Sequence, residues 1–199
     1  MKRAQQKIQT RKKLFQAAIE LFNCNGVEKT KISDIAKKAD VSTGTFYVHF
    51  KSKEEIISAI YYEDFNNYMC NKIQEVIQLN LDWKKTLLKI GIFELDFAKK
   101  VGLEVTTIAF VANLQANMST PGNHSKKRIF SNEIKKITDS FSNNNLAYQE
   151  FESIIRGVML TWCFSNGKID VIKLGNSLLE KYINKINDNE QRIVQNPNI

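Results

Sequence analysis

The sequence predicts an all-α fold in two parts, a basic N-terminal domain of residues 1–52 and a larger helical domain of residues 53–199. Apolar residues recur at spacings of three and four along most of the chain, which is the helical period. Only two prolines and eight glycines interrupt the 199 residues. The positive charge is uneven: residues 1–53 hold twelve Lys and Arg against four Asp and Glu, whereas the remainder is neutral. This asymmetry is typical of a segment that meets a polyanion, joined to a body that does not.

Two helices are expected at the start of the basic domain. Residues 8–25 show an apolar stripe at helical spacing, and Gly26 follows as a C-terminal stop. Residues 31–38 form the second expected helix, with Thr30 as its N-cap.

The stretch VSTGTFYVHFKSKEE, residues 41–55, holds many strand-forming residues but is expected to begin with a short helix. Phe46 and Phe50 lie four residues apart and therefore share one helical face. Their burial is worth about 1.5–3 kcal/mol each. That exceeds the few tenths of a kcal/mol per residue by which Thr, Val and Tyr disfavour a helix. The expected packing partners are the apolar residues of the two preceding helices: Leu14, Ala18, Phe22 and Ile35.

Two short helices joined by the four-residue turn Ala39-Asp40-Val41-Ser42 predict a helix-turn-helix. The Val41 side chain would pack into the core between the two helices, and Ser42 would be the N-cap of the second helix. The face opposite Phe46 would then meet DNA, and its members are Thr43, Gly44, Thr45, Tyr47 and, obliquely, His49. Lys53 begins the next helix, after the capping box Ser52-x-x-Glu55, and can reach a phosphate.

The recognition helix has none of the Arg, Lys, Asn or Gln side chains that make bidentate contacts to bases. We therefore expect this helix to make few direct contacts that distinguish one base from another. We expect much of the specificity to come from DNA shape and from a basic N-terminal arm that carries Lys2, Arg3, Lys7 and Arg11.

The stretch KKLFQAAIELFNCNGVEKTKISDIAKKADVSTGTFYVHFKSKEEII resembles the DNA-binding domain of the TetR family of transcriptional repressors. The matching features are paired alanines before LF, a glycine four residues after it, DIA, VS-x-GTFY-x-HF and SKEE. The resemblance, over about residues 10–57, implies that Thr43, Thr45 and Tyr47 face the groove, and that Tyr47, His49 and Lys53 hold phosphates. Lys31 departs from the pattern, since many relatives have a threonine there, but a lysine can also reach a phosphate. The predicted DNA-binding residues are thus Lys31, Ser42, Thr43, Gly44, Thr45, Tyr47, His49 and Lys53.

Beyond the basic domain, one long helix is expected from Ser52 to about residue 79, followed by helices at about 83–100, 103–117 and 126–141. An aromatic-rich part of this body could line a cavity for a small apolar ligand, although such stripes are more often ordinary core. The candidates are Phe93, Phe97, Ile108, Phe110 and Leu114, with Glu94, Thr107, Asn113 or Gln115 as polar anchors. The resemblance implies that such a ligand favours a DNA-incompetent state, acting through the long helix from Ser52.

The last two helices are expected at about 147–165 and 170–187, joined by the turn Asn166-Gly167-Lys168-Ile169. Each has an interior glycine, Gly157 or Gly175, for which close helix crossing is a plausible reason. The resemblance implies a four-helix bundle with a second copy, and plain intramolecular core is the alternative. The predicted dimer residues are Phe151, Ile155, Val158, Trp162, Leu179 and Ile183.

The function predicted is a ligand-responsive regulator that binds a palindromic operator as a homodimer, most simply a repressor. A transcriptional activator and a nonspecific nucleoid-type DNA binder are the alternatives. An enzyme is disfavoured, because the chain has two histidines, no metal-ligand spacing and no catalytic motif. No cofactor or membrane partner is expected. Three widely spaced cysteines and the lack of a secretory signal or long apolar run predict a cytoplasmic protein with free thiols.

Overall fold

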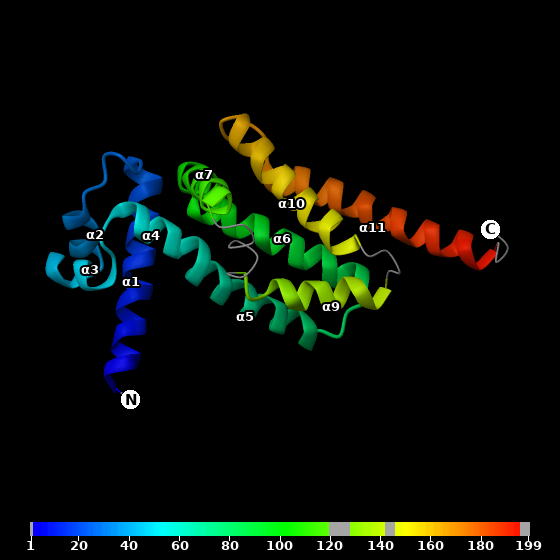
Figure 1. The fold of residues 1–199 in the computed structure, drawn as a ribbon, viewed down its shortest axis with the longest axis horizontal. Coiled ribbons are helices and arrows are strands. Elements are labelled where there is room, and N and C mark those ends of the chain that lie inside the picture. The colour runs from blue at the N-terminus through cyan, green and yellow to red at the C-terminus, as the bar shows by residue number, and fades with distance from the viewer. Residues whose placement is uncertain (1, 120–127, 142–145, 196–199) are drawn as a thin grey trace. The chain divides into compact units, whose positions relative to one another are not determined.

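The computed structural model describes residues 2–119, 128–141 and 146–195. Every regular element in these ranges is a helix, and Figure 1 shows no strand among them. The prediction of an all-α fold, with an N-terminal helix-turn-helix followed by a larger helical part, is therefore confirmed. The expected loop at 119–125 and the break at 142–145 lie almost wholly outside the described residues.

The basic domain consists of α1 (Lys2–Asn25), α2 (Ile32–Lys38) and α3 (Thr43–His49). The α1 helix begins at residue 2, so the basic N-terminal segment expected as an arm is the first part of a helix. Thr30 is not the N-cap of α2, because Lys31 holds that position without a side-chain hydrogen bond. The Thr30 hydroxyl is buried and donates instead to the Gly26 carbonyl oxygen, at 2.7 Å. It stabilises the turn rather than the helix that follows.

The long helix expected after Ser52 is interrupted. It consists of α4 (Lys53–Ala59), the π-helical turn η1 (Ile60–Asp64) and α5 (Phe65–Gln78). Ser52 caps α4 as expected, since its hydroxyl accepts from the Glu55 N–H at 3.2 Å. The Glu55 carboxylate accepts from the Lys51 N–H, so the capping box closes one residue before the cap. The prediction of one continuous α-helix is wrong at η1.

The chain divides into two compact units. One comprises Met1–Tyr68 and Ala98–Arg128, and the other comprises Met69–Phe97 and Ile129–Ile199. The remaining helices are α6 (Trp83–Val101), α7 (Leu103–Ser119), α9 (Ser131–Phe141), α10 (Ala147–Phe164) and α11 (Val171–Gln195). The boundary expected between residues 52 and 53 stays a prediction.

In the first unit, α7 holds the turn between α1 and α2. The Glu104 carboxylate accepts from the Val27 N–H at 2.8 Å, and the Asn23 side chain donates to the Lys100 carbonyl oxygen at 3.0 Å. These bonds fix the end of α6 and the beginning of α7 to the basic domain.

In the second unit, the apolar stripes of α10 and α11 form intramolecular core. The residues predicted at a dimer interface are at most 8% exposed in the single chain: Phe151, Ile155, Val158, Trp162, Leu179 and Ile183. In the single chain these side chains form the intramolecular core that was the alternative reading, and their place at a dimer interface stays a prediction. The periodicity identified the buried face, and the chain itself covers it.

The two interior glycines, Gly175 of α11 and Gly157 of α10, have different surroundings. A Cβ on Gly175 would lie 2.0 Å from Leu95 Cδ1 of α6, so the absence of a side chain permits the close crossing that was expected. A Cβ on Gly157 would meet nothing within 4 Å. Close crossing inside the chain therefore explains Gly175 and leaves Gly157 on an open face of α10.

Candidate nucleic-acid interface

The turn between α2 and α3 is a left-handed helix termination. Asp40 has φ of 59° and follows the C-cap Ala39. The Val41 N–H donates to the Ala36 carbonyl oxygen at 3.0 Å, and the Asp40 N–H donates to that of Lys37 at 3.1 Å. These two bonds form a Schellman motif, which satisfies the last carbonyls of α2. Val41 is half-buried, so it plugs the space between the helices only in part.

Burial on one side and a cap at its beginning hold α3 in place. Ser42 accepts from the Thr45 N–H at 3.0 Å, as an N-cap does. Phe46 and Phe50 are at most 1% exposed, with ring centroids 5.7 Å apart. The side chains expected to cover them are buried as well: Leu14, Ala18, Phe22 and Ile35. A segment of strand-forming residues is thus helical because its two aromatic residues lie in the core.

The opposite face of α3 is exposed and uncharged. Thr43 and Gly44 are exposed, and Tyr47 is 54% exposed. A Cβ on Gly44 would meet only Ser42 Oγ, at 3.6 Å, so packing within the chain does not require a glycine there. Val48, which is not among the predicted DNA-binding residues, is 76% exposed. The sequence could have indicated this exposure, since Val48 lies four residues after Gly44 and therefore on the same face of the helix.

The basic residues expected to hold phosphates occupy different environments. Lys31 is exposed beside the start of α2. The Lys53 ammonium donates to the carbonyl oxygens of Val27 and Glu28, at 2.8 and 3.1 Å, which leaves one of its three hydrogens for a phosphate. Burial, assisted by the cations of Arg11 and Lys7, lowers the pKa of His49. His49 is therefore neutral at pH 7 and could contact a phosphate only as a hydrogen-bond donor.

Arg11 is not available as part of a basic arm. Its guanidinium is bound to Glu63 and to the carbonyl oxygen of His49. Arg3 and Lys7 remain exposed on the first turns of α1. Lys31 and Lys53 can therefore contact phosphates, whereas Arg11 binds other groups of the protein.

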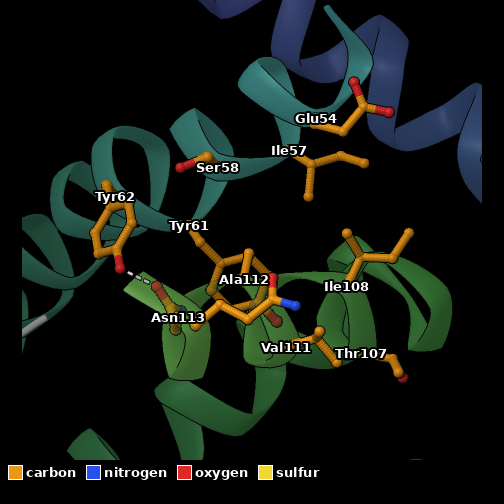
Figure 2. Close-up of a pocket in the computed structure, with 12 residues that line it drawn as sticks. Glu54, Ile57, Ser58, Tyr61, Tyr62, Thr107, Ile108, Val111, Ala112 and Asn113 are labelled. Carbon is orange, nitrogen blue, oxygen red and sulfur yellow. Dashed lines mark hydrogen bonds between the residues drawn. The ribbon is translucent and has the colours of Figure 1, made fainter. Parts of the chain in front are cut away.

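The first unit also holds a cavity of about 400 Å³, lined by α4, η1 and α7. Figure 2 shows Tyr61 and Tyr62 extending from η1 toward α7. The Tyr61 hydroxyl donates to Thr106 Oγ1 at 2.7 Å, and that of Tyr62 donates to Asn113 Oδ1. Burial raises the pKa of Tyr62, which keeps its phenol protonated as a donor. Among the described residues that line this cavity, none is Lys or Arg.

The cavity agrees only in part with the expected ligand-binding residues. Ile108 lines it, together with the expected anchors Thr107, Asn113 and Gln115. Phe110 and Leu114 are not among its lining residues, and Leu114 is 63% exposed on α7. Phe93 and Phe97 belong to the second unit. Tyr61 and Tyr62 were not predicted to line a cavity, because they fall within the segment expected to form one long helix from Ser52.

Two further kinds of feature, a metal site and a membrane span, were sought among the described residues. Within residues 2–119, 128–141 and 146–195, no cluster of His, Cys, Asp and Glu could hold a metal ion. No helix in the same ranges combines the length and the apolar character that crossing a bilayer requires.

Comparisons with known proteins agree with this arrangement. Residues 14–60 match the family model of bacterial regulatory proteins, tetR family. The fatty acid metabolism regulator protein of Bacillus subtilis (strain 168) is 26% identical over 194 residues, which cover 88% of this chain and 94% of that protein.

Two solved structures share the fold. One is a TetR-family regulator from Rhodococcus sp., with a TM-score of 0.60, 17% identity and coverage of 89% of this chain and 98% of that one. The other is FadR from Bacillus subtilis in complex with stearoyl-CoA, with a TM-score of 0.56, 24% identity and coverage of 86% and 96%. These relatives are regulators rather than enzymes. The helix-turn-helix of residues 14–60 is therefore similar to that of the tetR family of bacterial regulatory proteins, and the all-helical fold of the chain is shared with these solved structures.

Proposed function

We propose that this protein is a transcriptional repressor that binds a palindromic operator as a homodimer and is released by a small effector. The observation that carries the proposal is α3, a short helix fixed by buried Phe46 and Phe50 whose opposite face is exposed. That face carries Thr43, Gly44, Tyr47 and Val48, and it lies in the segment that holds all of the chain's excess positive charge.

The chemistry of this face suits contact in a major groove. Thr hydroxyls can bond base edges, and the methyl groups of Thr and Val can meet thymine methyls. Gly44 allows the backbone to approach closely. Lys31 and the third hydrogen of the Lys53 ammonium supply sequence-independent attraction to phosphates.

The homodimer would use the open faces of α10 and α11, not their buried stripes. Gly157, Thr161 and Phe164 lie on one face of α10 at spacings of four and three, and Phe164 is 89% exposed. On α11, Leu178 is 38% exposed. A glycine with nothing near it, on the same face as a largely exposed phenylalanine two turns away, suits a close crossing with a second helix. A twofold pair would present two recognition helices to two half-sites about one helical turn apart.

The effector would enter the cavity between α4, η1 and α7. A volume of about 400 Å³ is within the range of small-molecule sites. Its lining is mainly apolar, with the hydroxyls and amides of Tyr62, Asn113 and Gln115 as anchors. Since stearoyl-CoA is bound by FadR of Bacillus subtilis, a fatty-acyl chain is a concrete candidate. The phosphates of coenzyme A would need cations from outside this lining.

A selection from random duplex DNA tests the proposal. The purified protein should enrich duplexes with two inverted half-sites whose centres lie about 34–36 Å, or a multiple of that distance, apart. Addition of palmitate or stearoyl-CoA then tests release of the enriched duplex, and a reporter with this duplex between promoter and gene tests repression. Failure to enrich any sequence would contradict specific binding. Enrichment of single half-sites alone would contradict the dimer.

A further inference from the structure

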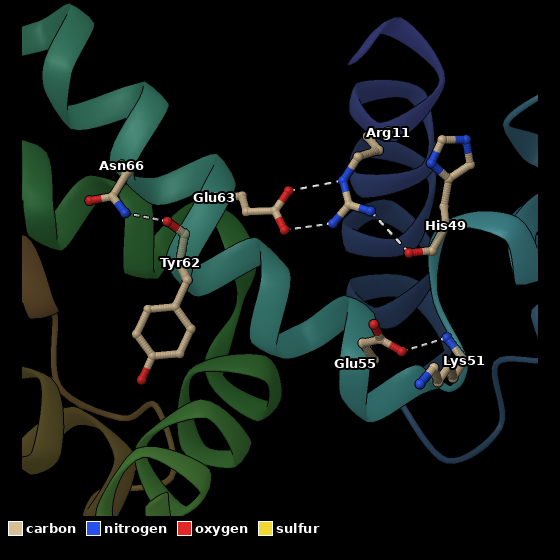
Figure 3. A network of polar contacts seen from close by, with 7 residues as sticks. All are labelled: Arg11, His49, Lys51, Glu55, Tyr62, Glu63 and Asn66. Atoms are coloured by element: carbon tan, nitrogen blue, oxygen red, sulfur yellow. Dashed lines mark hydrogen bonds and ion pairs between the residues drawn. The ribbon is translucent and has the colours of Figure 1, made fainter. Parts of the chain in front are cut away.

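Arg11 is held in one arrangement by three hydrogen bonds. Its Nε and Nη2 donate to the two carboxylate oxygens of Glu63, at 2.9 and 2.6 Å. Its Nη1 donates to the carbonyl oxygen of His49 at 2.9 Å. The guanidinium carbon also lies 4.2 Å from the centre of the Phe50 ring. Figure 3 shows the guanidinium between the carboxylate and the backbone of the recognition segment.

The bond to His49 acts on the end of the recognition helix. His49 is the last residue of α3, and carbonyls at a helix C-terminus lack partners within the helix. A cation at this end also interacts favourably with the helix dipole. The planar guanidinium can bind a carboxylate with two N–H groups and donate a third to a carbonyl, which a lysine ammonium cannot do in this geometry. Arg11 therefore fixes the end of α3 against α1.

Glu63 comes from the π-helical turn that also lines the cavity. Tyr61 and Tyr62 precede it directly and are bonded to Thr106 and Asn113 of α7. The side chain of Asn66 donates to the carbonyl oxygen of Tyr62, which supports the widened turn. Three consecutive residues of η1 thus serve two purposes: two bind α7 across the cavity, and one binds Arg11.

We infer that Glu63 and Arg11 transmit the state of the cavity to the recognition helix, and that Arg11 is a positioning residue for DNA binding. This inference rests on the proposed function. A ligand that displaces Tyr61 or Tyr62 from α7 changes the backbone of η1, and Glu63 moves with it. Arg11 then loses its bidentate partner, and α3 loses the contact that fixes its C-terminal end. The ligand needs only to favour this second arrangement over the first.

A double-mutant cycle tests this coupling without a known effector. The probe is a duplex that the protein has enriched from a random library, with a random duplex as reference. Glu63→Gln should weaken binding to the enriched duplex about threefold to tenfold. Binding to the random duplex should change little, because it depends on phosphates and not on the placement of α3. A loss of folded protein would lower both affinities together, so their ratio separates positioning from a merely structural role.

Tyr62→Phe supplies the second arm of the cycle, since it removes the bond to Asn113. It should weaken binding to the enriched duplex in the wild-type background and have no further effect together with Glu63→Gln. Arg11→Lys keeps the positive charge and should behave like Glu63→Gln. The matched control is Glu75→Gln, which removes an exposed ion pair with Lys72 on α5 and should leave both affinities unchanged.

Three results would overturn the inference. Additive effects of Tyr62→Phe and Glu63→Gln would show that the cavity does not act through Glu63. Wild-type binding by Arg11→Lys would show that charge alone matters. Equal affinities of the Glu63→Gln and Glu75→Gln proteins for the enriched duplex would show that Glu63 has no specific role in DNA binding. If the wild type itself does not prefer the enriched duplex, the proposed function fails together with the inference, and the same titrations distinguish that case.

Discussion

The recognition helix α3 and the C-terminal pair α10 and α11 both present an apolar stripe, but the stripes support different conclusions. In α3, the stripe of Phe46 and Phe50 packs inside the basic domain, and the opposite face is free for a partner. In α10 and α11, the stripe expected to meet a second copy is also buried inside the chain. A helical period identifies which face is buried, but it does not identify what buries it.

The difference follows from the number of available partners. A basic domain of about 50 residues has only its own helices to cover two aromatic residues, so the sequence assigns them correctly. The helical body has several helices that could cover the stripe of α10, and a second copy adds another. The informative residues there are on the other face, where Phe164 is exposed and Gly157 has no neighbour.

The largest expected effect concerns the buried face of α3. Phe46→Ala should destabilise the protein by about 3–5 kcal/mol, because it leaves a cavity in the core of a small domain. Val48→Ala, on the exposed face, should change the free energy of unfolding by less than about 0.5 kcal/mol. Denaturant unfolding of both variants checks the contrast. Similar losses for the two would mean that α3 does not have one buried and one free face.

The next effect concerns the buried side of α11. Gly175→Ala should destabilise by about 1–3 kcal/mol, because the new Cβ would overlap with Leu95. Ser177→Ala, at an exposed position on the same helix, is the matched control and should stay within about 0.5 kcal/mol of the wild type. A stabilised Gly175→Ala protein would contradict the close crossing and leave only the gain in helix propensity.

The open face of α10 gives the third prediction. Gly157→Arg should shift the protein from dimer to monomer in sedimentation experiments and leave its helix content in circular dichroism unchanged. The reason is that an arginine there meets nothing inside the chain but would obstruct a crossing helix. Gln74→Arg, at an exposed position on α5, serves as the control for added charge. A Gly157→Arg protein that stays dimeric would place the interface elsewhere.

The smallest effect concerns the turn that leads into α3. Asp40→Gly should stabilise the protein by less than about 1 kcal/mol, because relief of the left-handed strain at φ of 59° is partly offset by the conformational entropy that a glycine adds to the unfolded chain. Thermal unfolding at neutral pH measures this gain. A loss of stability would show that the Asp40 side chain contributes more to the turn than its backbone strain removes.

The helix-turn-helix could be predicted because its signals are local. Ser42 and Ser52 cap helices as their positions suggest, and Gly26 ends α1 with φ of 82°. The π-helical turn could not be predicted in this way. Its bonds from Tyr61 and Tyr62 lead to Thr106 and Asn113, more than 40 residues away. In a sequence, Ile60 and Tyr61 fit an unbroken α-helix equally well.

The candidate cavity, too, could be predicted only where its signals are local in the sequence. Ile108 and Asn113 were expected to contribute because they lie in an apolar segment with polar anchors. The opposite wall comes from α4 and η1, and only the fold brings that wall to α7. Arg11 also looked like one more cation for DNA, because its partners Glu63 and His49 are distant in the chain.

A competition between the enriched duplex and random duplex at near-physiological salt tests the central claim most directly. The exposed face of α3 should make the protein prefer the enriched duplex by at least about a thousandfold. The Thr43→Ala protein should keep part of this preference, since DNA shape contributes as well. Equal affinity of the wild type for the two duplexes would contradict sequence-specific recognition by α3 and would favour a nonspecific DNA-binding protein.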